Sequence, residues 1–142
     1  MTSPFLPKPA YGAPCNNCGR CCVDALCWIG RLILGPQVKS PCPALIDTAA
    51  GRELFCGLMV NPQDYLPEQA KIVGAEAMCA AAKSLIGAGD GCSLRYPHEP
   101  ENPAFKRQSG LRKLTRKRII KLLAVLGIGY PQAIAFLKKR GL

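Results

Sequence analysis

The segment CNNCGRCC, residues 15–22, places four cysteines within eight residues and decides how the rest of the chain is interpreted. The chain has 142 residues and nine cysteines. The other five are spread singly along the chain: Cys27, Cys42, Cys56, Cys79 and Cys92. A buried cysteine can act as a small apolar residue, but two adjacent cysteines behind a Cys-x-x-Cys pair do not suit packing. The segment therefore predicts either disulfides or a metal site.

Metal is favoured over disulfides by the rest of the sequence. The first residues, MTSPFLPKPAYGAP, contain no basic stretch followed by an apolar one, so no secretory signal is expected. No apolar run approaches the ~20 residues of a membrane span. The sequence thus predicts a cytoplasmic protein without a transmembrane segment, and structural disulfides are rare in the reducing cytoplasm. Metal ligation requires neither oxidation nor an even number of thiols.

The spacing of the first four cysteines suits a metal. Cys15 and Cys18 form a Cys-x-x-Cys turn that can hold two sulfur atoms about 3.5–4 Å apart, the edge of a tetrahedron with bonds near ~2.3 Å. Gly19 permits positive φ, which lets the chain curl around an ion. Cys21 extends the pattern to the three-thiol run that ligates iron–sulfur clusters in bacterial ferredoxins. Cys22 directly follows Cys21. Because neighbouring side chains diverge, the two sulfur atoms can bind a cluster of several metal atoms more easily than they can bind a single ion. The predicted cofactor is an iron–sulfur cluster, [4Fe–4S], with zinc as the alternative.

The same segment resembles the signature of the zinc- or iron-chelating CxxCxxCC family, the YkgJ-type cysteine-cluster proteins. That family tends to continue with a CPxL segment and a Gly-Cys element before an Arg/Pro-rich stretch. Here CPAL, 42–45, and DGCSLRYP, 90–97, are similar to these two features, and Cys56 is a rival match for the second. The resemblance covers about residues 13–97, although the family often has a further cysteine where this chain has none after Cys92.

This resemblance implies metal chelation, and iron–sulfur binding in particular. The ligands that the spacing and the resemblance together predict are Cys15, Cys18, Cys21, Cys22, Cys42, Cys56 and Cys92. Cys42 is followed by Pro43, as a remote cysteine is in ferredoxins. Cys27 and Cys79 have no clear counterpart in the family. The resemblance implies no particular reaction for a chain of this length.

Charge is distributed unevenly along the chain. Residues 102–142 contain 11 Lys and Arg and no acid, whereas residues 1–101 have a net charge of −1. A solvated amphipathic helix docked on the body is the favoured interpretation of the basic residues in this segment. A contact of residues 106–121 with nucleic acid is the next alternative, followed by an acidic protein or a membrane surface. Aromatic residues are sparse in this segment, so base stacking is not expected.

The expected fold is mainly α with irregular cysteine-rich metal-binding loops. It comprises a small single domain and a basic helical C-terminal segment. The predicted divisions are an extended lead-in at 1–14, a cysteine-cluster metal-binding domain at 15–101 and the basic segment at 102–142. Only 6% of the residues are aromatic, so the core should consist of Ala, Leu, Ile and Val.

Local signals place the elements within these divisions. Helices are predicted at 23–35, ending at Gly35, at 66–87, starting at Pro67, at 109–127, and from Pro131 to Arg140. Loops are predicted at 40–62, with a turn near 48–51, and at 88–103. Trp28 is assigned to the core, Cys79 to the second helix and His98 to a solvated loop.

The predicted function is a metal-binding protein with an accessory, electron-transfer or structural role and no catalytic activity of its own. One histidine and scattered carboxylates make no catalytic arrangement. The first alternative is a nucleic-acid-binding accessory protein with a structural zinc site and a basic helical tail. The second is a subunit of a metal-dependent or redox enzyme.

Overall fold

A computed structural model of the chain describes residues 7–14, 18–24, 27–47, 54–86, 91–92, 94–103 and 114–142. About 53% of these residues are helical, and strands are few. The predicted class, a small single domain that is mainly α with cysteine-rich loops, is therefore confirmed.

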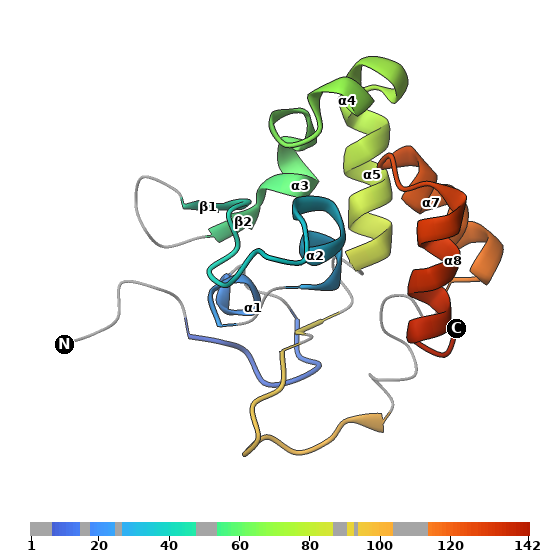
Figure 1. The fold of residues 1–142 in the computed structure, drawn as a ribbon. Coiled ribbons are helices and arrows are strands. Elements are labelled where there is room, and N and C mark those ends of the chain that lie inside the picture. Colours follow the sequence, from blue (N-terminus) through green and yellow to red (C-terminus); the bar gives the residue numbers. More distant parts are fainter. Residues whose placement is uncertain are drawn as a thin grey trace.

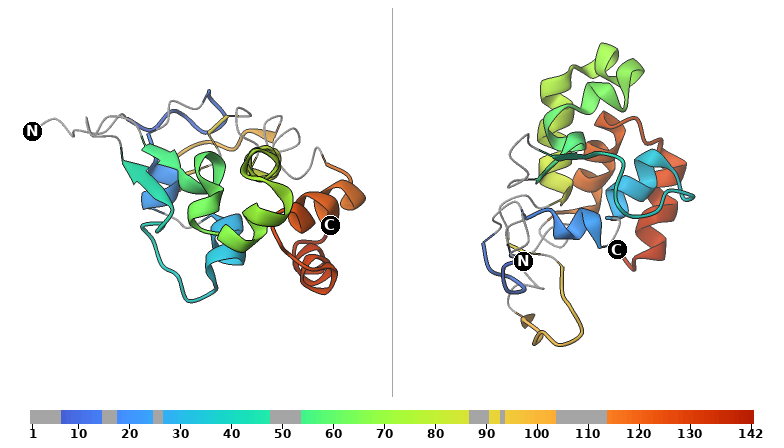
Figure 2. Two further views of the ribbon diagram at one scale, coloured as in Figure 1. Left: turned by 90° about the horizontal axis from the view of Figure 1, so that it is seen from above. Right: turned by 90° about the vertical axis from the view of Figure 1, so that its left-hand side faces the viewer.

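Four helices form one side of the molecule (Figure 1). The central one is α5, Ala75–Ile86, which follows α4, Pro67–Val73. Helix α7, Arg116–Val125, packs against α5, and α8, Tyr130–Lys139, packs against α7. Figure 2 shows α7 and α8 on the same side of α5 in both views. We call these four helices the helical half.

Shorter elements form the other side, which we call the cysteine-rich half. In chain order they are α1, Arg20–Val23, α2, Trp28–Leu34, β1, Leu45–Asp47, β2, Leu54–Cys56, and α3, Gly57–Val60. A single 3-10 turn, η1, Pro62–Asp64, leads into α4. The two strands pair antiparallel, with Leu45 opposite Cys56 and Asp47 opposite Leu54. Helix α3 packs against α5 and joins the two halves.

The predicted loop at 40–62 is wrong where the hairpin and α3 occur. Each strand has only three residues, too few to display an alternating pattern in the sequence. The predicted turn at 48–51 lies outside the described residues. The loop predicted at 88–103 contains no helix or strand of more than one residue in the part that is described.

The helix predicted at 66–87 starts at Pro67, as expected, but it is two helices. Gly74 ends α4 with φ +86, a backbone conformation that side chains other than that of glycine rarely adopt. A Cβ at this position would meet no atom within 4 Å, so the conformation and not crowding requires glycine. The helix predicted at 23–35 is likewise divided between α1 and α2, although its end before Gly35 is confirmed.

The C-terminal helices follow the prediction more closely. Helix α7 starts after Thr115, whose side-chain oxygen accepts the N–H of Arg118 at 3.2 Å. This N-cap explains why the helix starts later than residue 109; residues 109–113 lie outside the described residues. Helix α8 has Pro131 in its first turn, as expected for a residue without a backbone donor.

The core is made of small and aliphatic side chains, as predicted. Its fully buried members include Ile29, Leu58, Met78, Ala82, Leu85, Ile119, Leu123, Ala133 and Leu137. Four of these come from α7 and α8, so the basic C-terminal segment contributes to the same core as the body. Two cysteines, Cys22 and Cys42, also belong to this core. Trp28 is partly buried and packs against it.

Candidate metal centre

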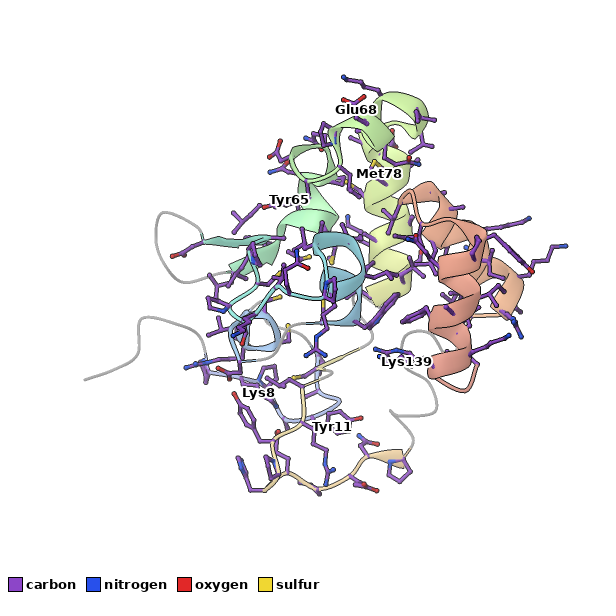
Figure 3. All side chains as sticks on the ribbon, in the orientation of Figure 1. Lys8, Tyr11, Tyr65, Glu68, Met78 and Lys139 are labelled. Atoms are coloured by element: carbon purple, nitrogen blue, oxygen red, sulfur yellow. The ribbon has the colours of Figure 1, made fainter. Side chains whose placement is uncertain are left out.

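Five cysteines from four short segments come together in the cysteine-rich half. Cys21 and Cys22 lie in α1, Cys27 precedes α2, Cys42 precedes β1, and Cys56 ends β2. Figure 3 shows sulfur atoms gathered where α1, α2 and the hairpin meet. We call these five residues the five-cysteine cluster.

Backbone hydrogen bonds hold the segments of this cluster in register. The N–H of Cys42 donates to the carbonyl of Cys22 at 2.8 Å, which ties the start of the hairpin to α1. The N–H of Leu45 donates to the carbonyl of Cys42 at 3.0 Å, and Leu45 is paired with Cys56 across the hairpin. The peptide backbone, and not the sulfur atoms alone, therefore determines which cysteines become neighbours.

The ionisation of these thiols shows that their sulfur atoms interact. Burial, and to a smaller extent the charges of Cys27 and Cys42, raise the pKa of Cys56 to about 11. Burial also raises the pKa of Cys27, with further increases from Cys42 and Cys21. A thiolate that disfavours another must lie within its electrostatic field. The thiols therefore oppose one another's ionisation.

Backbone N–H groups near two of the cysteines nevertheless favour a thiolate. Cys27 is the N-cap of α2, and its Sγ accepts the N–H of Gly30 at 3.3 Å. Cys56 precedes α3, and the N–H groups of Leu58 and Met59 act to lower its pKa. Burial and neighbouring charge outweigh these bonds. Among the described residues, no basic side chain is found to lower the pKa of Cys22, Cys27 or Cys56.

Cys21 and Cys22 are linked as a pair. Cys21 is exposed, and a hydrogen bond from the Cys22 thiol lowers the pKa of Cys21 to about 7. The same bond raises the pKa of Cys22, and burial and the charges of Cys21 and Cys56 raise it further. We therefore assign the first thiolate of the cluster to Cys21, at its solvent-facing edge.

The start of the predicted motif is described only in part. Cys15 lies outside the described residues. Cys18 is buried and directly precedes Gly19, which has φ +70, as the motif predicts. A Cβ on Gly19 would lie 2.3 Å from Cδ1 of Leu54, so the turn packs tightly against β2. Any other residue at position 19 would displace the hairpin.

Cys92 contacts a different part of the chain. Its N–H donates to the carbonyl of Ala13 at 2.7 Å, and its carbonyl accepts the N–H of Gly12 at 2.9 Å. The ammonium group of Lys8 also interacts with its thiol. These contacts place Cys92 on the N-terminal segment, and none of the interactions found for the described residues joins it to the five-cysteine cluster.

The remaining predicted features have local explanations. Cys79 lies on α5, as predicted, with its Sγ 3.9 Å from the carbonyl of Val60. His98 is exposed, with its ring centroid 5.7 Å from that of Tyr96. On α7, the four basic side chains that the structure describes are exposed: Arg116, Lys117, Arg118 and Lys121. Residues 106–113 of the predicted contact segment 106–121 lie outside the described residues.

The five-cysteine cluster fits a metal in chemistry but not in its present spacing. Thiolates are the ligands that zinc, Cu(I) and iron–sulfur clusters prefer. Within the described ranges, however, no three His, Cys, Asp or Glu side chains are placed to hold one metal ion. None of the eight described cysteines is bonded to another of the eight.

Comparisons of this chain with protein-family models, with curated proteins and with solved structures found no match. The resemblance to the CxxCxxCC family therefore stays a prediction. Among the helices in the described ranges, none is long and apolar enough to cross a membrane.

Cys27 is the residue that sequence reasoning omitted from the predicted ligands. Its signal was its position directly before an apolar helix, where a side chain can accept a backbone N–H. The predicted helix at 23–35 placed Cys27 inside a helix instead, which concealed this role. In the structure Cys27 lies within the electrostatic field of Cys21, Cys42 and Cys56, whereas the contacts found for Cys92 are with the N-terminal segment.

Proposed function

We propose that the protein chelates a metal through the five-cysteine cluster, with Cys15 and Cys18 available from the adjacent motif. The observation that carries this proposal is the mutual electrostatic effect of thiols from separate segments of the chain. Packing alone gives no reason to place sulfur atoms where each one disfavours the ionisation of the next. A cation reverses the sign of that interaction, because it attracts every thiolate at once.

Metal binding must also displace the protons of the ligand thiols. Each ligand thiol releases its proton to solvent as its sulfur binds the metal. Cys56, with a pKa of about 11, is almost fully protonated at pH 7, so its proton must leave on binding. The backbone N–H groups that face Cys27 and Cys56 then stabilise the thiolates, because they donate to the charged form.

Iron in a cluster is our preferred cofactor, and zinc is the alternative. Vicinal ligands such as Cys21 and Cys22 suit a cluster with several metal atoms better than a single tetrahedral ion. The bound centre would supply either electron transfer or structural cross-linking. The proposal also requires the sulfur atoms to lie closer together in the metal-bound protein than in this structure.

The proposal assumes a reducing compartment such as the cytoplasm, because oxidised thiols cannot serve as ligands. The resemblance of residues 13–97 to the CxxCxxCC family is a supporting hypothesis. An accessory role in nucleic-acid binding through residues 106–121, and a role as a subunit of a redox enzyme, both stay predictions.

The test is metal content after anaerobic purification. We expect stoichiometric iron with acid-labile sulfide and broad absorbance near ~400 nm. The variants Cys27→Ala and Cys56→Ala should lose most of the metal, and Cys79→Ala is the matched control that should keep it. Circular dichroism checks that each variant is folded. Proton release on adding metal to the chelator-treated protein gives an independent count of ligand thiols.

Two results would contradict the proposal. One is a folded wild-type protein that contains neither iron nor zinc. The other is unchanged metal content in both cluster variants. A colourless protein with stoichiometric zinc would leave chelation intact and overturn only the choice of iron.

A further inference from the structure

A groove of about 1250 Å³ lies between α2 and α8, and none of its described lining residues belongs to the predicted contact segment 106–121. One wall comes from α2 and the residues that follow it, from Trp28 to Ser40, and the other from α8. The right-hand view of Figure 2 shows these two helices side by side. Lys139, labelled in Figure 3, lies near the C-terminal end of α8. None of the described residues that line the groove is a cysteine, so it is a different site from the candidate metal centre.

Aromatic rings hold an arginine in this groove. Trp28 and Phe136 are stacked, with ring centroids 4.7 Å apart and planes at 24°. The guanidinium of Arg140 lies 5.5 Å from the Trp28 centroid and 5.1 Å from that of Phe136. A guanidinium that rests on rings keeps its N–H donors directed sideways, where they can bind phosphate in two-point fashion.

The charge of the groove is strongly positive and unbalanced. Its basic residues are Arg31, Lys39, Lys139 and Arg140. Asp24 is the acidic residue among those that line it, and this carboxylate already accepts the Tyr96 hydroxyl and pairs with Arg20. Within the described part of the chain, none of the four cations forms an ion pair with a carboxylate.

Two of these cations also repel each other. The pKa of Arg140 is lowered first by burial and then by the charge of Arg31. Two guanidinium groups within each other's field repel, and an anion bound between them would relieve this repulsion. The arrangement is therefore complementary to a chain of negative charges.

We propose that this groove binds the phosphodiester backbone of a single-stranded nucleic acid. Its volume exceeds the roughly 300–1000 Å³ of typical small-molecule sites, which favours a strand over a mononucleotide. A concave groove also admits a single strand more readily than a wide, rigid duplex. The faces of Trp28 and Phe136 are engaged with each other and with Arg140, so the bases are not read by stacking on them. Binding is therefore independent of sequence and dominated by phosphate contacts.

The salt dependence of binding gives a quantitative test. Each phosphate contact to a single strand contributes about 0.7 to the slope of log affinity against log salt. The double variant Lys39→Gln/Lys139→Gln removes two exposed cations, so the magnitude of the slope should fall by about 1.4. Fluorescence anisotropy with a labelled 12-nucleotide single strand, measured between 50 and 200 mM salt on the full chain, provides this slope.

The matched control removes the same charge from α7. The double variant Lys117→Gln/Lys121→Gln should change the slope by less than half as much. Equal changes in the two variants would overturn the proposal, because they would indicate diffuse attraction by net charge. An unchanged slope in the groove variant would overturn it too.

Two further ligands distinguish binding of a single strand from binding of other molecules that carry phosphate. AMP should displace the labelled strand only at far higher concentration than an unlabelled strand does. Phosphatidylserine vesicles should bind the groove variant as well as they bind the wild type. The proposal fails if AMP competes as well as the strand, or if the groove variant loses vesicle binding while it keeps strand binding.

Discussion

The two halves of the molecule reach stability by different means. The helical half has long elements and a continuous core of Leu, Ile and Ala side chains, in which Leu85, Ile119 and Leu123 are almost fully buried. The cysteine-rich half has helices of four and seven residues before the hairpin, and strands of three. Three of its buried positions are cysteines: Cys18, Cys22 and Cys42.

This difference assigns a separate task to each half. Short elements bury little apolar surface and recover little of the entropy lost on ordering the chain. In the cysteine-rich half, thiols with raised pKa values occupy buried or half-buried positions, as at Cys22 and Cys56. Both halves share one core, but we expect the short elements around the cysteines to depend more on a bound metal than the helical half does.

Removal of the metal is the largest expected effect. A metal present at a thousand times its dissociation constant stabilises the protein that binds it by about 4 kcal/mol. Chelation should therefore increase hydrogen exchange in α2, α3 and β2, while the amides of α5 and α7 stay protected. Exchange measured by mass spectrometry with and without chelator tests this. A uniform change in both halves would show that they do not differ in this way.

A core substitution in α7 should affect the helical half next most strongly. Leu123 is fully buried, so Leu123→Ala should lower the free energy of unfolding by about 3 kcal/mol through lost contacts and the cavity left behind. Urea denaturation measures this loss. Ile72→Ala, at a side chain that is 77% exposed, is the control and should change stability little. A small effect of Leu123→Ala would contradict the role given to α7.

The core contribution of α7 and α8 also changes how the basic segment can be studied. Deleting residues 104–142 would remove Ile119, Leu123, Leu126, Ala133 and Leu137 from the core. Such a deletion would unfold the protein whether or not the segment binds nucleic acid. Substitution of exposed Lys residues is therefore the informative experiment.

The sequence was most informative where local physics decides the structure. Apolar spacing and Pro131 predicted α7 and α8, because both signals act within one helix. The break at Gly74 was missed, because a glycine inside a helical pattern does not reveal which backbone conformation it adopts. The hairpin was missed because its strands depend on pairing with each other and not on their own pattern.

The candidate site was predicted only in part for a similar reason. Spacing identifies the dense motif around Cys18, Cys21 and Cys22, because those residues are neighbours in sequence. It cannot decide which distant cysteine joins them. Whether Cys27 or Cys92 is a ligand stays a prediction: the charges of Cys42 and Cys21 act on Cys27, and backbone hydrogen bonds join Cys92 to residues 12–13.

Alkaline pH should lower the free energy of unfolding by a smaller amount, through a cysteine of the cysteine-rich half. With chelator and reductant present, Cys56 has a pKa of about 11 in the folded state, against an ordinary value of 9. The unfolded chain thus releases this proton first, so stability falls between pH 9 and 11, by roughly 2–3 kcal/mol for this residue. Cys56→Ala should show a shallower fall than wild type, and Cys79→Ala the same fall. Identical pH profiles for all three would refute the assignment of the raised pKa to Cys56.

The smallest effect concerns the link that Glu99 makes between residues 94–103 and the N-terminal segment. The same N-terminal segment also contacts Cys92. The Glu99 carboxylate accepts the N–H of Tyr96 at 2.8 Å, the N–H of Tyr11 at 3.1 Å and the ammonium group of Lys8 at 2.9 Å. The Tyr96 bond is the main cause that lowers the pKa of Glu99 to about 2, followed by the Lys8 bond. The stabilisation is therefore complete above the ordinary carboxyl pKa of 4.5 and is lost as the pH falls toward 2.

Glu99→Gln should loosen this link without affecting the metal. Amide exchange at Tyr11 and Tyr96 should increase at pH 7, because a neutral amide accepts these N–H bonds less strongly than a carboxylate does. Metal content should stay at the wild-type value, since the contacts found for Cys92 are with the N-terminal segment and Leu94, and Cys92→Ala should likewise keep the metal. Glu101→Gln is the matched control for exchange. Loss of metal from Cys92→Ala would make Cys92 a ligand after all, and the N-terminal segment would then belong to the metal centre.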